Sequence, residues 1–267
     1  MKRYRLEPGK PVDLSRWDAG STAGFKGGKD KVQPVLDELN GRLEVLQEKL
    51  WAEGERGVLV VLQGMDTSGK DGTIRHVFDG VNPSGVRVAS FKAPTEEERA
   101  HDFLWRVHPK MPGKGEMVIF NRSHYEDVLV VRVRSLAPKK IWKARYDQIN
   151  QFEKLCADNG TTILKFFLHI DRDEQKERLE ARLADPQKSW KFRAGDLEDR
   201  ALWDDYQTAY EDALAKTATP WAPWYVVPAN RKWFRNLVVA TALVDALEAM
   251  KIKDPRPAED LSGVVVE

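Results

Sequence analysis

The segment from Gly64 to Asp71 reads Gly-Met-Asp-Thr-Ser-Gly-Lys-Asp and constrains the fold more than any other feature of the chain. The apolar run 58–62 directly precedes it, and a helix-compatible stretch from about 73 to 78 follows. In this context the glycines let backbone N–H groups converge on a phosphate, and the helix N-terminus adds positive potential. The alternative is an ordinary glycine-rich turn between a strand and a helix. We predict that the segment is a phosphate-binding P-loop.

We expect the side chain of Lys70 to reach the phosphoryl group that such a loop holds. Arginines near the loop add further donors, because a guanidinium pairs with phosphate through a rigid fork. The predicted phosphate-binding residues are Gly64, Thr67, Ser68, Gly69, Lys70, Asp71, Gly72, Thr73, Arg75 and Arg122.

Asp71 stands where a P-loop usually carries the Ser or Thr that ligates Mg²⁺. A carboxylate also holds hard cations, but it adds negative charge close to the phosphates. Alternatively, Asp71 caps the helix that follows. We therefore look elsewhere for metal ligands, and predict Asp66 in the loop and Asp127 after a later strand.

The composition bounds the class of protein. The 267 residues contain 43 Lys and Arg against 42 Asp and Glu, so no global charge argues for a nucleic-acid or membrane partner. Cys156 is the single cysteine, which excludes an intrachain disulfide and fits a reducing compartment. No apolar stretch approaches the ~20 residues of a membrane span. We expect a cytoplasmic protein.

Five short apolar runs alternate with helical patterns along the chain, which predicts an α/β fold with a parallel sheet covered by helices on both faces. Residues 1–30 contain several Gly and Pro and are expected to be irregular, and the tail from Ile252 is expected to lie along the surface. The predicted strands are 58–62, 86–91, 117–120, 162–170 and 224–227. The predicted helices, besides the one after the loop, are 32–52, 95–108, 139–158, 173–184, 197–216 and 233–250.

The first predicted helix carries a leucine stripe, because Leu36, Leu39, Leu43, Leu46 and Leu50 recur at spacings of three and four. Such a stripe packs on the sheet of its own domain or forms the seam of a dimer, and the first use is commoner.

Polar residues follow the third predicted strand, where ligands gather in open α/β sheets. Arg122 is placed to pair with a phosphate, with a surface ion pair as the alternative. Asp127 or Glu126 is placed to hold Mg²⁺, although Glu126 also suits a helix start. His124 is expected to be structural or to line the rim, because phosphoryl transfer needs little acid–base chemistry.

A basic cluster with interleaved Trp190 and Phe192 follows the fourth predicted strand. Arg178 and Arg182 share one helix face there, which indicates a lid that closes over phosphates. The alternative is a solvated charged helix in which Arg178 pairs with nearby glutamates. A site for single-stranded nucleic acid is disfavoured by the balanced charge. The basic residues of the cluster are Lys176, Arg178, Arg182, Lys188, Lys191 and Arg193.

Three segments of the chain closely resemble the family-2 polyphosphate kinases: 64–73, 81–86 (Val-Asn-Pro-Ser-Gly-Val) and 120–129 (Phe-Asn-Arg-Ser-His-Tyr-Glu-Asp-Val-Leu). Trp190-Lys191-Phe192 and Asp199-Arg200 look like the lid of that family. The resemblance runs from roughly Gly27 to Asn236 and includes the Asp after the P-loop lysine.

The resemblance implies a three-layer P-loop kinase fold akin to thymidylate kinases. It further implies a single domain over 1–267, with an N-terminal extension and helix at about 1–56 and a helical lid at about 173–207. The implied activity moves the terminal phosphoryl group of inorganic polyphosphate to a nucleotide, reversibly, with Mg²⁺ or Mn²⁺. Glu126 before Asp127 and the short single-domain form look most like the subgroup that accepts both nucleoside mono- and diphosphates. AMP, ADP and ATP are the implied nucleotides, with guanine nucleotides as further candidates, and a homo-oligomer, dimer or tetramer, is expected.

Carried onto this sequence, the resemblance assigns catalytic roles to Asp66, Lys70, Arg122, Asp127, Arg178 and Arg182, with Asp66 and Asp127 as metal ligands. We expect the acceptor nucleotide beside the second strand and the segment after it. The expected nucleotide-binding residues are Lys92, Pro94, Thr95, Arg106, Asn121 and Glu126.

Two other functions remain open at this point. An ATP-dependent nucleoside or nucleotide kinase of the thymidylate kinase type predicts a purine pocket on the donor side. A non-catalytic nucleotide-binding module needs fewer charged residues than the chain provides.

Overall fold

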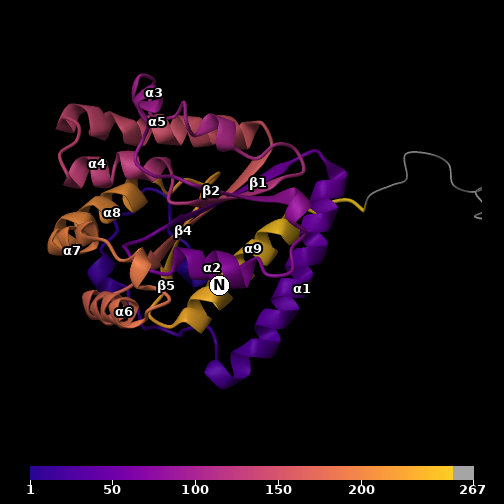
Figure 1. The fold of residues 1–267 in the computed structure, drawn as a ribbon. Helices are drawn as coiled ribbons and strands as arrows, with labels where there is room; N and C mark the ends of the chain where they lie inside the picture. The colour runs from indigo at the N-terminus through magenta and orange to yellow at the C-terminus, as the bar shows by residue number, and fades with distance from the viewer. Residues whose placement is uncertain (255–267) are drawn as a thin grey trace, which may run out of the picture.

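A five-stranded parallel sheet forms the centre of the protein (Figure 1). The computed structural model describes residues 1–254. The strand order is β2-β3-β1-β4-β5, and every adjacent pair is parallel. This confirms the predicted parallel sheet. The strands are β1 Gly57–Gln63, β2 Val86–Ser90, β3 Met117–Asn121, β4 Thr161–His169 and β5 Trp224–Pro228.

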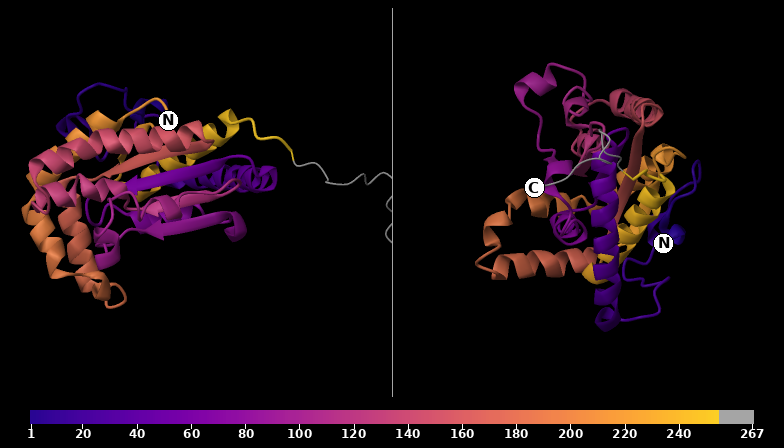
Figure 2. Two further views of the ribbon diagram at one scale, coloured as in Figure 1. Left: turned by 90° about the horizontal axis from the view of Figure 1, so that it is seen from above. Right: turned by 90° about the vertical axis from the view of Figure 1, so that its right-hand side faces the viewer.

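Helices cover both faces of the sheet and give the predicted three-layer α/β/α arrangement (Figures 1 and 2). One layer holds α1 (Lys29–Glu53), α2 (Lys70–Val77) and α9 (Lys232–Ala249), in which α9 contacts both α1 and α2. The other layer holds α4 (Val130–Val133), α5 (Lys139–Asp158) and α8 (Trp203–Thr217), which contact one another. α6 (Arg172–Ala184) and α7 (Ala194–Ala201) follow β4 and lie beyond the carboxyl edge of the sheet, at the left of Figure 1. The short α3 (Glu96–Arg99) belongs to the connection between β2 and β3.

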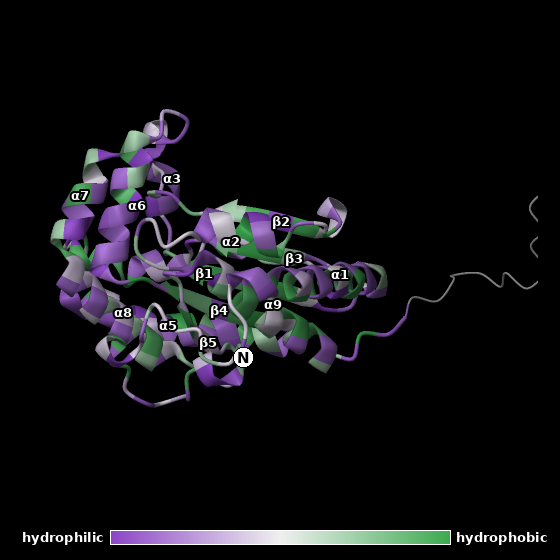
Figure 3. Ribbon diagram, turned by 90° about the horizontal axis from the view of Figure 1, so that it is seen from below, coloured by the Kyte–Doolittle hydropathy of each residue, from purple (hydrophilic) through white to green (hydrophobic). Residues whose placement is uncertain are grey.

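Burial explains why the apolar runs became strands. Every residue of β1 and β5 is buried, and the central strands are drawn mostly in green, the colour of hydrophobic residues, in Figure 3. β2 differs from the expectation, because it is an edge strand whose residues Arg87 and Val88 are exposed. The leucine stripe packs inside the chain, where α1 lies against α9. The stripe therefore packs within its own domain, but its main partner is the helix α9 and not the sheet, which was the predicted partner.

Two predicted helices differ from the structure. The helix predicted at 95–108 ends at Arg99, because the Asp102 carboxylate accepts a hydrogen bond from the Leu104 amide at 2.9 Å and forms a turn that competes with the helix. The helix predicted at 197–216 is broken at Leu202 into α7 and α8.

The N-terminal segment is irregular, as expected, and lies along β5. The Leu6 amide donates to the Trp224 carbonyl at 2.8 Å, and Arg5 forms an antiparallel bridge with Tyr225. At the other end, the tail expected along the surface falls mostly on residues 255–267, which lie outside the described residues. Across residues 1–254, no helix combines the length and apolar character that a membrane crossing requires.

Candidate active site

The P-loop lies at the carboxyl end of β1, between β3 on one side and β4 on the other. Leu62 of β1 is in register with Asn121 of β3, and the Leu62 carbonyl accepts a hydrogen bond from the Arg122 amide at 3.1 Å. Since the chain connections diverge around β1, the loop opens into the crevice where open α/β sheets bind ligands. The structure therefore brings the predicted P-loop and the residues after β3 to one edge.

Glycine is required at both ends of the loop. Gly64 has φ +153°, and a Cβ atom there would lie 2.7 Å from the Leu168 carbonyl oxygen. Gly69 has φ +98°, and a Cβ atom there would overlap the Arg235 guanidinium. Thr67 between them adopts a left-handed conformation with φ 64°, which is uncommon for a β-branched residue. Such strain persists only where surrounding contacts hold it, and it often marks functional loops.

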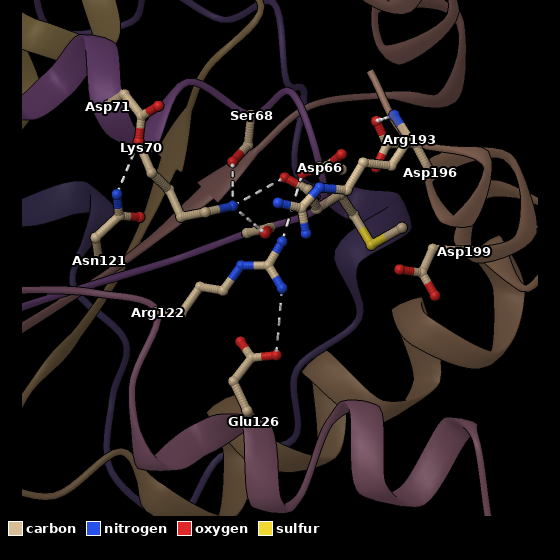
Figure 4. Close-up of polar contacts among 12 residues, drawn as sticks. Asp66, Ser68, Lys70, Asp71, Asn121, Arg122, Glu126, Arg193, Asp196 and Asp199 are labelled. Carbon is tan, nitrogen blue, oxygen red and sulfur yellow. Dashed lines mark hydrogen bonds and ion pairs between the residues drawn. The ribbon is translucent and has the colours of Figure 1, made fainter. Parts of the chain in front are cut away.

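Lys70 begins α2 and is almost fully buried. Its ammonium group donates to the Gly64 carbonyl at 2.8 Å and to the Met65 carbonyl at 3.2 Å, and lies 3.4 Å from Ser68 Oγ (Figure 4). Burial, with the nearby Arg122 guanidinium, lowers the pKa of Lys70 to about 8. Among residues 1–254, only uncharged oxygens of its own loop bind this ammonium group, so its charge is available to an anion that enters the loop.

Two side chains of α6 form hydrogen bonds with the backbone of the P-loop. Gln175 Nε2 donates to the Asp66 carbonyl at 3.3 Å, and Arg178 Nη1 donates to the Thr67 carbonyl at 2.9 Å. Arg178 also donates to the carbonyls of Ala229 and Asn230 at 2.7 and 3.0 Å, and to Glu174 at 2.6 Å. Thus Arg178 pairs with a nearby glutamate, as one alternative predicted, and its other bonds connect Thr67 of the strained loop to the backbone that follows β5.

Arg122 lies between two carboxylates (Figure 4). Its guanidinium is 3.5 Å from Asp66 and 3.8 Å from Glu126, and it has the left-handed φ of 62°. Glu126, and then Asp66, raise the pKa of Arg122 against partial desolvation by the surrounding protein. These separations are long for hydrogen bonds, so Arg122 can exchange the carboxylates for phosphate oxygens at small cost.

Asp66 contacts Arg182 of α6 and Asp196 of α7, in the segment predicted to be a lid. Arg182 Nη1 lies 3.7 Å from Asp66 and 3.3 Å from Asp196. Burial raises the pKa of Asp66, but Lys70 and the two arginines outweigh it, and the net pKa is lowered. Burial and contact with Asp66 raise the pKa of Asp196 to about 6. Asp196, in the segment predicted to be a lid, is therefore an additional carboxylate at the site that the sequence did not reveal.

The two predicted metal ligands, Asp127 and Asp66, contact different residues in the described part of the chain. One Asp127 oxygen accepts a hydrogen bond from Arg145 Nη1 at 3.0 Å, and burial raises the pKa of Asp127. Within residues 1–254, no group of three or more His, Cys, Asp or Glu side chains is placed to hold a metal ion by itself. Mg²⁺ often uses one or two carboxylates together with substrate phosphates, so the partly buried carboxylate of Asp66 in the loop still fits it.

Asp71 connects α2 to two other parts of the site. It lies in the first turn of α2 but makes no capping hydrogen bond, so the capping alternative is wrong. Its carboxylate accepts a hydrogen bond from Asn121 Nδ2 at 2.7 Å (Figure 4). It also lies 3.6 Å from the Lys191 ammonium group. Asp71 therefore links the end of β3 to the basic cluster that was predicted to close over the site.

The predicted nucleotide-binding residues after β2 are bound to one another. The Arg106 guanidinium donates to Glu98 at 2.9 Å and to the Lys92 carbonyl at 2.7 Å. Thr95 caps α3 in a reciprocal capping box with Glu98. The Pro94 carbonyl accepts a hydrogen bond from Arg99 at 3.0 Å. These contacts order the segment itself, and leave the Lys92 ammonium group exposed for a ligand.

A buried polar network lies behind the turn that carries Arg122. Lys165 Nζ donates to Glu153 Oε2 at 2.6 Å, to the Tyr125 hydroxyl oxygen at 2.8 Å and to the Thr217 carbonyl at 2.8 Å. The Tyr125 hydroxyl donates to Glu153 Oε1 at 2.8 Å, and His124 Nε2 lies 3.2 Å from the same oxygen. The structural role proposed for His124 therefore agrees with its position, and sequence reasoning did not identify this network.

A cavity of about 810 Å³ extends from the P-loop along α2 toward α1, α6 and α9. Cationic side chains dominate its wall. They are Lys29, Lys70, Arg75, Arg178, Arg182, Lys188, Lys191, Lys232 and Arg235, against Asp37, Asp66, Asp71 and Asp79.

The family model described as polyphosphate kinase 2 matches residues 26–255. The chain belongs to the polyphosphate kinase 2 family. It is 59% identical over 267 residues to the AMP/ADP-polyphosphate phosphotransferase of Meiothermus ruber, covering 100% of both chains. It is 42% identical to the ADP-polyphosphate phosphotransferase of Rhodopseudomonas palustris, covering 95% of this chain and 92% of that one. The crystal structure of polyphosphate kinase 2 from Arthrobacter aurescens TC1 superposes with a TM-score of 0.93 at 45% identity, covering 97% of this chain and 92% of that chain. The resemblance stated from the motifs is thus confirmed, as is the fold class.

The structure brings most of the predicted phosphate site together and leaves some residues apart. Loop residues, Arg75 and both lid arginines line one cavity, whereas Arg122 and Asp127 lie toward the end of β3. Arg235 and Asp196 were missed. A signal for Arg235 existed, because a charged residue in an otherwise apolar helix is rarely buried without a purpose.

Proposed function

We propose that this polyphosphate kinase 2 transfers the terminal phosphoryl group of inorganic polyphosphate to nucleoside mono- and diphosphates, reversibly. The observation that carries the proposal is the cavity at the P-loop, with nine Lys or Arg side chains against four Asp. Polyphosphate has neither base nor ribose, so its site needs positive charge along a groove and little apolar surface. The name of the Meiothermus ruber relative supports both AMP and ADP as acceptors.

We place the donor chain in the cavity and the acceptor nucleotide on the β2–β3 side. Lys70, Arg122 and Arg182 then surround the transferred group and neutralise the charge that spreads over its oxygens in the transition state. An acceptor phosphate is already ionised at neutral pH, so no residue needs to act as a base. Lys92, Pro94, Thr95, Arg106, Asn121 and Glu126 remain the proposed residues of the acceptor side.

Mg²⁺ is the proposed cofactor, with Mn²⁺ as a substitute. Asp66 fits this role, because its carboxylate borders the loop and makes only long contacts with Arg122 and Arg182. Asp127 remains the second proposed ligand, since Arg145 occupies one of its two oxygens. When bound, the ion would shield the phosphate charges from one another.

The segment at about 173–207 is proposed to be a lid on a single domain over 1–267. Asp199 of α7 accepts from Arg134 at 2.7 Å and from the Tyr206 hydroxyl at 2.9 Å, and Arg182 of α6 reaches Asp66. These contacts support a segment that closes the cavity and excludes water during transfer. Arg178 at its base holds the loop.

A homo-oligomer, dimer or tetramer, and a cytoplasmic location are also proposed. Val45 and Trp51 are exposed on the face of α1 opposite its leucine stripe, and Val88 is exposed on the edge strand β2, which supports a further interface. The single cysteine supports a reducing compartment.

The purified protein with Mg²⁺, polyphosphate and AMP tests the proposal, with products followed by chromatography. We expect ADP and then ATP, and no product from AMP when polyphosphate is omitted. Parallel reactions with ADP as acceptor, and with ATP as sole donor, separate the alternatives. Product from ADP but not AMP would restrict the acceptor, and transfer only from ATP would favour a nucleotide kinase of the thymidylate kinase type.

The cavity argues against that last alternative. A purine pocket needs apolar walls, but the cavity offers only Leu36, Ala181 and Trp233 as apolar side chains. A non-catalytic nucleotide-binding module is disfavoured by the number of cations gathered around one loop.

A further inference from the structure

Arg235 lies in the first turn of α9, and only 2% of its surface is exposed. It nevertheless forms part of the wall of the cavity at the P-loop. A buried arginine in a protein interior is normally paired with a carboxylate, because an uncompensated buried charge is strongly destabilising. The partners of Arg235 therefore indicate why it is there.

Arg235 has a single side-chain partner. Its Nε and Nη2 both donate to Asn236 Oδ1, at 3.1 and 2.8 Å. In the part of the chain that the structure describes, Nη1 has no hydrogen-bond acceptor, and no carboxylate lies within 4.0 Å of the guanidinium. Asn236 thus orients the group without neutralising it.

The free Nη1 points at the P-loop. It occupies the space that a Cβ atom of Gly69 would fill, and Nη2 lies 3.3 Å from the corresponding position at Gly72. Gly69 precedes the first residue of α2, so the guanidinium approaches the positive end of a helix. Without an anion, this arrangement places like charges together.

Neighbouring side chains add to the positive charge. Burial, with the nearby Arg178 guanidinium, lowers the pKa of Arg235 to about 9. Burial, Arg178 and Arg235 also lower the pKa of Lys232. Arg178 itself is bound to Glu174 and to three backbone carbonyls, so its charge is paired and four of its five N–H donors are used within the protein. Arg235 is the arginine of this group whose charge is left without a counter-ion.

We infer that Arg235 is a phosphate-binding residue, whose Nη1 donates to an oxygen of a phosphate seated on the P-loop at Gly69. The inference deepens the proposed function and rests on it, because it assigns this side chain to the donor chain. Asn236 is a positioning residue that holds the guanidinium toward the loop. In the free protein the positive charge of the Arg235 guanidinium is uncompensated, and a bound phosphate compensates it.

Two substitutions test the inference through binding alone. Arg235→Met removes the charge, and Asn236→Asp is nearly isosteric but places a carboxylate against Nε and Nη2. Lys143→Met is the charge-matched control for the first, because Lys143 is exposed on α5 and makes no ion pair among the described residues. Calorimetric titration with tripolyphosphate and Mg²⁺, without nucleotide, gives the Kd, and thermal unfolding without ligand gives the Tm.

We expect Arg235→Met to weaken tripolyphosphate binding by about tenfold to a hundredfold, the usual worth of a hydrogen bond to a charged group. Asn236→Asp should weaken it in the same direction. Both variants should unfold at the same temperature as the wild type or higher, because Arg235→Met removes the uncompensated buried charge and Asn236→Asp pairs it with a carboxylate. Lys143→Met should leave the Kd within twofold.

A Kd within twofold of the wild type in Arg235→Met would overturn the inference, as would failure of that variant to fold, which would make Arg235 a structural residue. The AMP assay separates this from the proposed function. Wild-type protein that makes ADP from AMP and polyphosphate, with unchanged binding in Arg235→Met, rejects the inference alone. Wild-type protein that binds tripolyphosphate but transfers nothing rejects the proposed function.

Discussion

Lys165 and Lys70 are both almost fully buried, and burial lowers the pKa of each to about 8. Lys165 belongs to β4, and its ammonium group is bound by the Glu153 carboxylate of α5, the Tyr125 hydroxyl and the Thr217 carbonyl. Lys70 lies in the P-loop, and its hydrogen-bond partners are two loop carbonyls and a Ser hydroxyl. In both environments burial disfavours the charged form of the lysine, but different groups compensate the charge.

This difference distinguishes a lysine whose charge is paired inside the protein from one whose charge can bind a ligand. All three donors of Lys165 meet acceptors inside the protein, one of them ionised, so the pair needs nothing from outside. The positive charges around Lys70, with Arg235 behind the loop, are compensated only in part by protein carboxylates. A phosphate completes the second environment, whereas it has no place in the first.

Loss of the Lys70 ammonium group should have the largest effect. We expect Lys70→Ala to reduce turnover with polyphosphate by about a thousandfold or more, because the group stabilises charge that develops in the transition state. Stability in denaturant should not fall and is expected to rise, because the substitution removes a buried charge whose burial lowers its pKa. A folded variant that retains more than a tenth of wild-type turnover would contradict the role.

Loss of Glu153 should affect stability instead. We expect Glu153→Leu to lower the free energy of unfolding by about 3–5 kcal/mol, because it leaves Lys165 buried and unpaired. The double variant Glu153→Leu/Lys165→Met should recover most of that loss. Denaturant unfolding of the single and double variants measures both values, and equal instability of the two would mean that the unpaired charge is not the cause.

Substitution of Arg178 tests whether this side chain contacts the substrate or supports the P-loop. Because its donors bind Thr67, Ala229, Asn230 and Glu174, we expect Arg178→Ala to reduce kcat by about tenfold to a hundredfold through displacement of the loop. The reduction should be equal for short and long polyphosphate chains. A markedly larger loss with short chains would show that Arg178 grips the donor near the point of transfer.

The lowered pKa of Lys70 predicts opposite pH dependences for ligand affinity and for stability. Phosphate binds the charged lysine, so the affinity for tripolyphosphate should be full below pH 8 and fall by about tenfold between pH 7.5 and 9.5. For the ligand-free protein, a lysine whose folded pKa lies below its unfolded value costs stability when charged. That cost is present in full below about pH 8 and is relieved as the pH rises toward the unfolded pKa.

Calorimetric titrations across this pH range measure the change in affinity. Lys70→Arg is the matched control, because a guanidinium has a higher intrinsic pKa than an ammonium group and should give a shallower dependence at this position. A wild-type affinity that does not change with pH would show that Lys70 does not titrate in the free protein.

The sequence was sufficient to predict the parallel sheet and the P-loop, since both depend on local patterns. The run 58–62 and the glycines at 64 and 69 specify a strand and a phosphate loop within a few residues. The motif 120–127 likewise placed Arg122 and Glu126 beside that loop.

Contacts between segments that are far apart in the chain could not be predicted from sequence patterns. Arg178 is 111 positions from Thr67, and no spacing rule shows that its donors meet backbone carbonyls there. The approach of α9 to Gly69 depends on the packing of α9 against α2, so Arg235 was not recognised. The helix predicted at 95–108 failed because one side chain, Asp102, favoured a turn over helix continuation.

The most direct test is a crystal structure of the wild-type protein with tripolyphosphate, Mg²⁺ and AMP. We predict phosphate oxygens within about 3.2 Å of Lys70 Nζ and Arg235 Nη1, with the adenine ring outside the cavity, on the β2–β3 side. An adenine ring inside the cavity beside Trp233, with no phosphate at Arg235, would contradict the assignment of these unpaired charges to the polyphosphate donor.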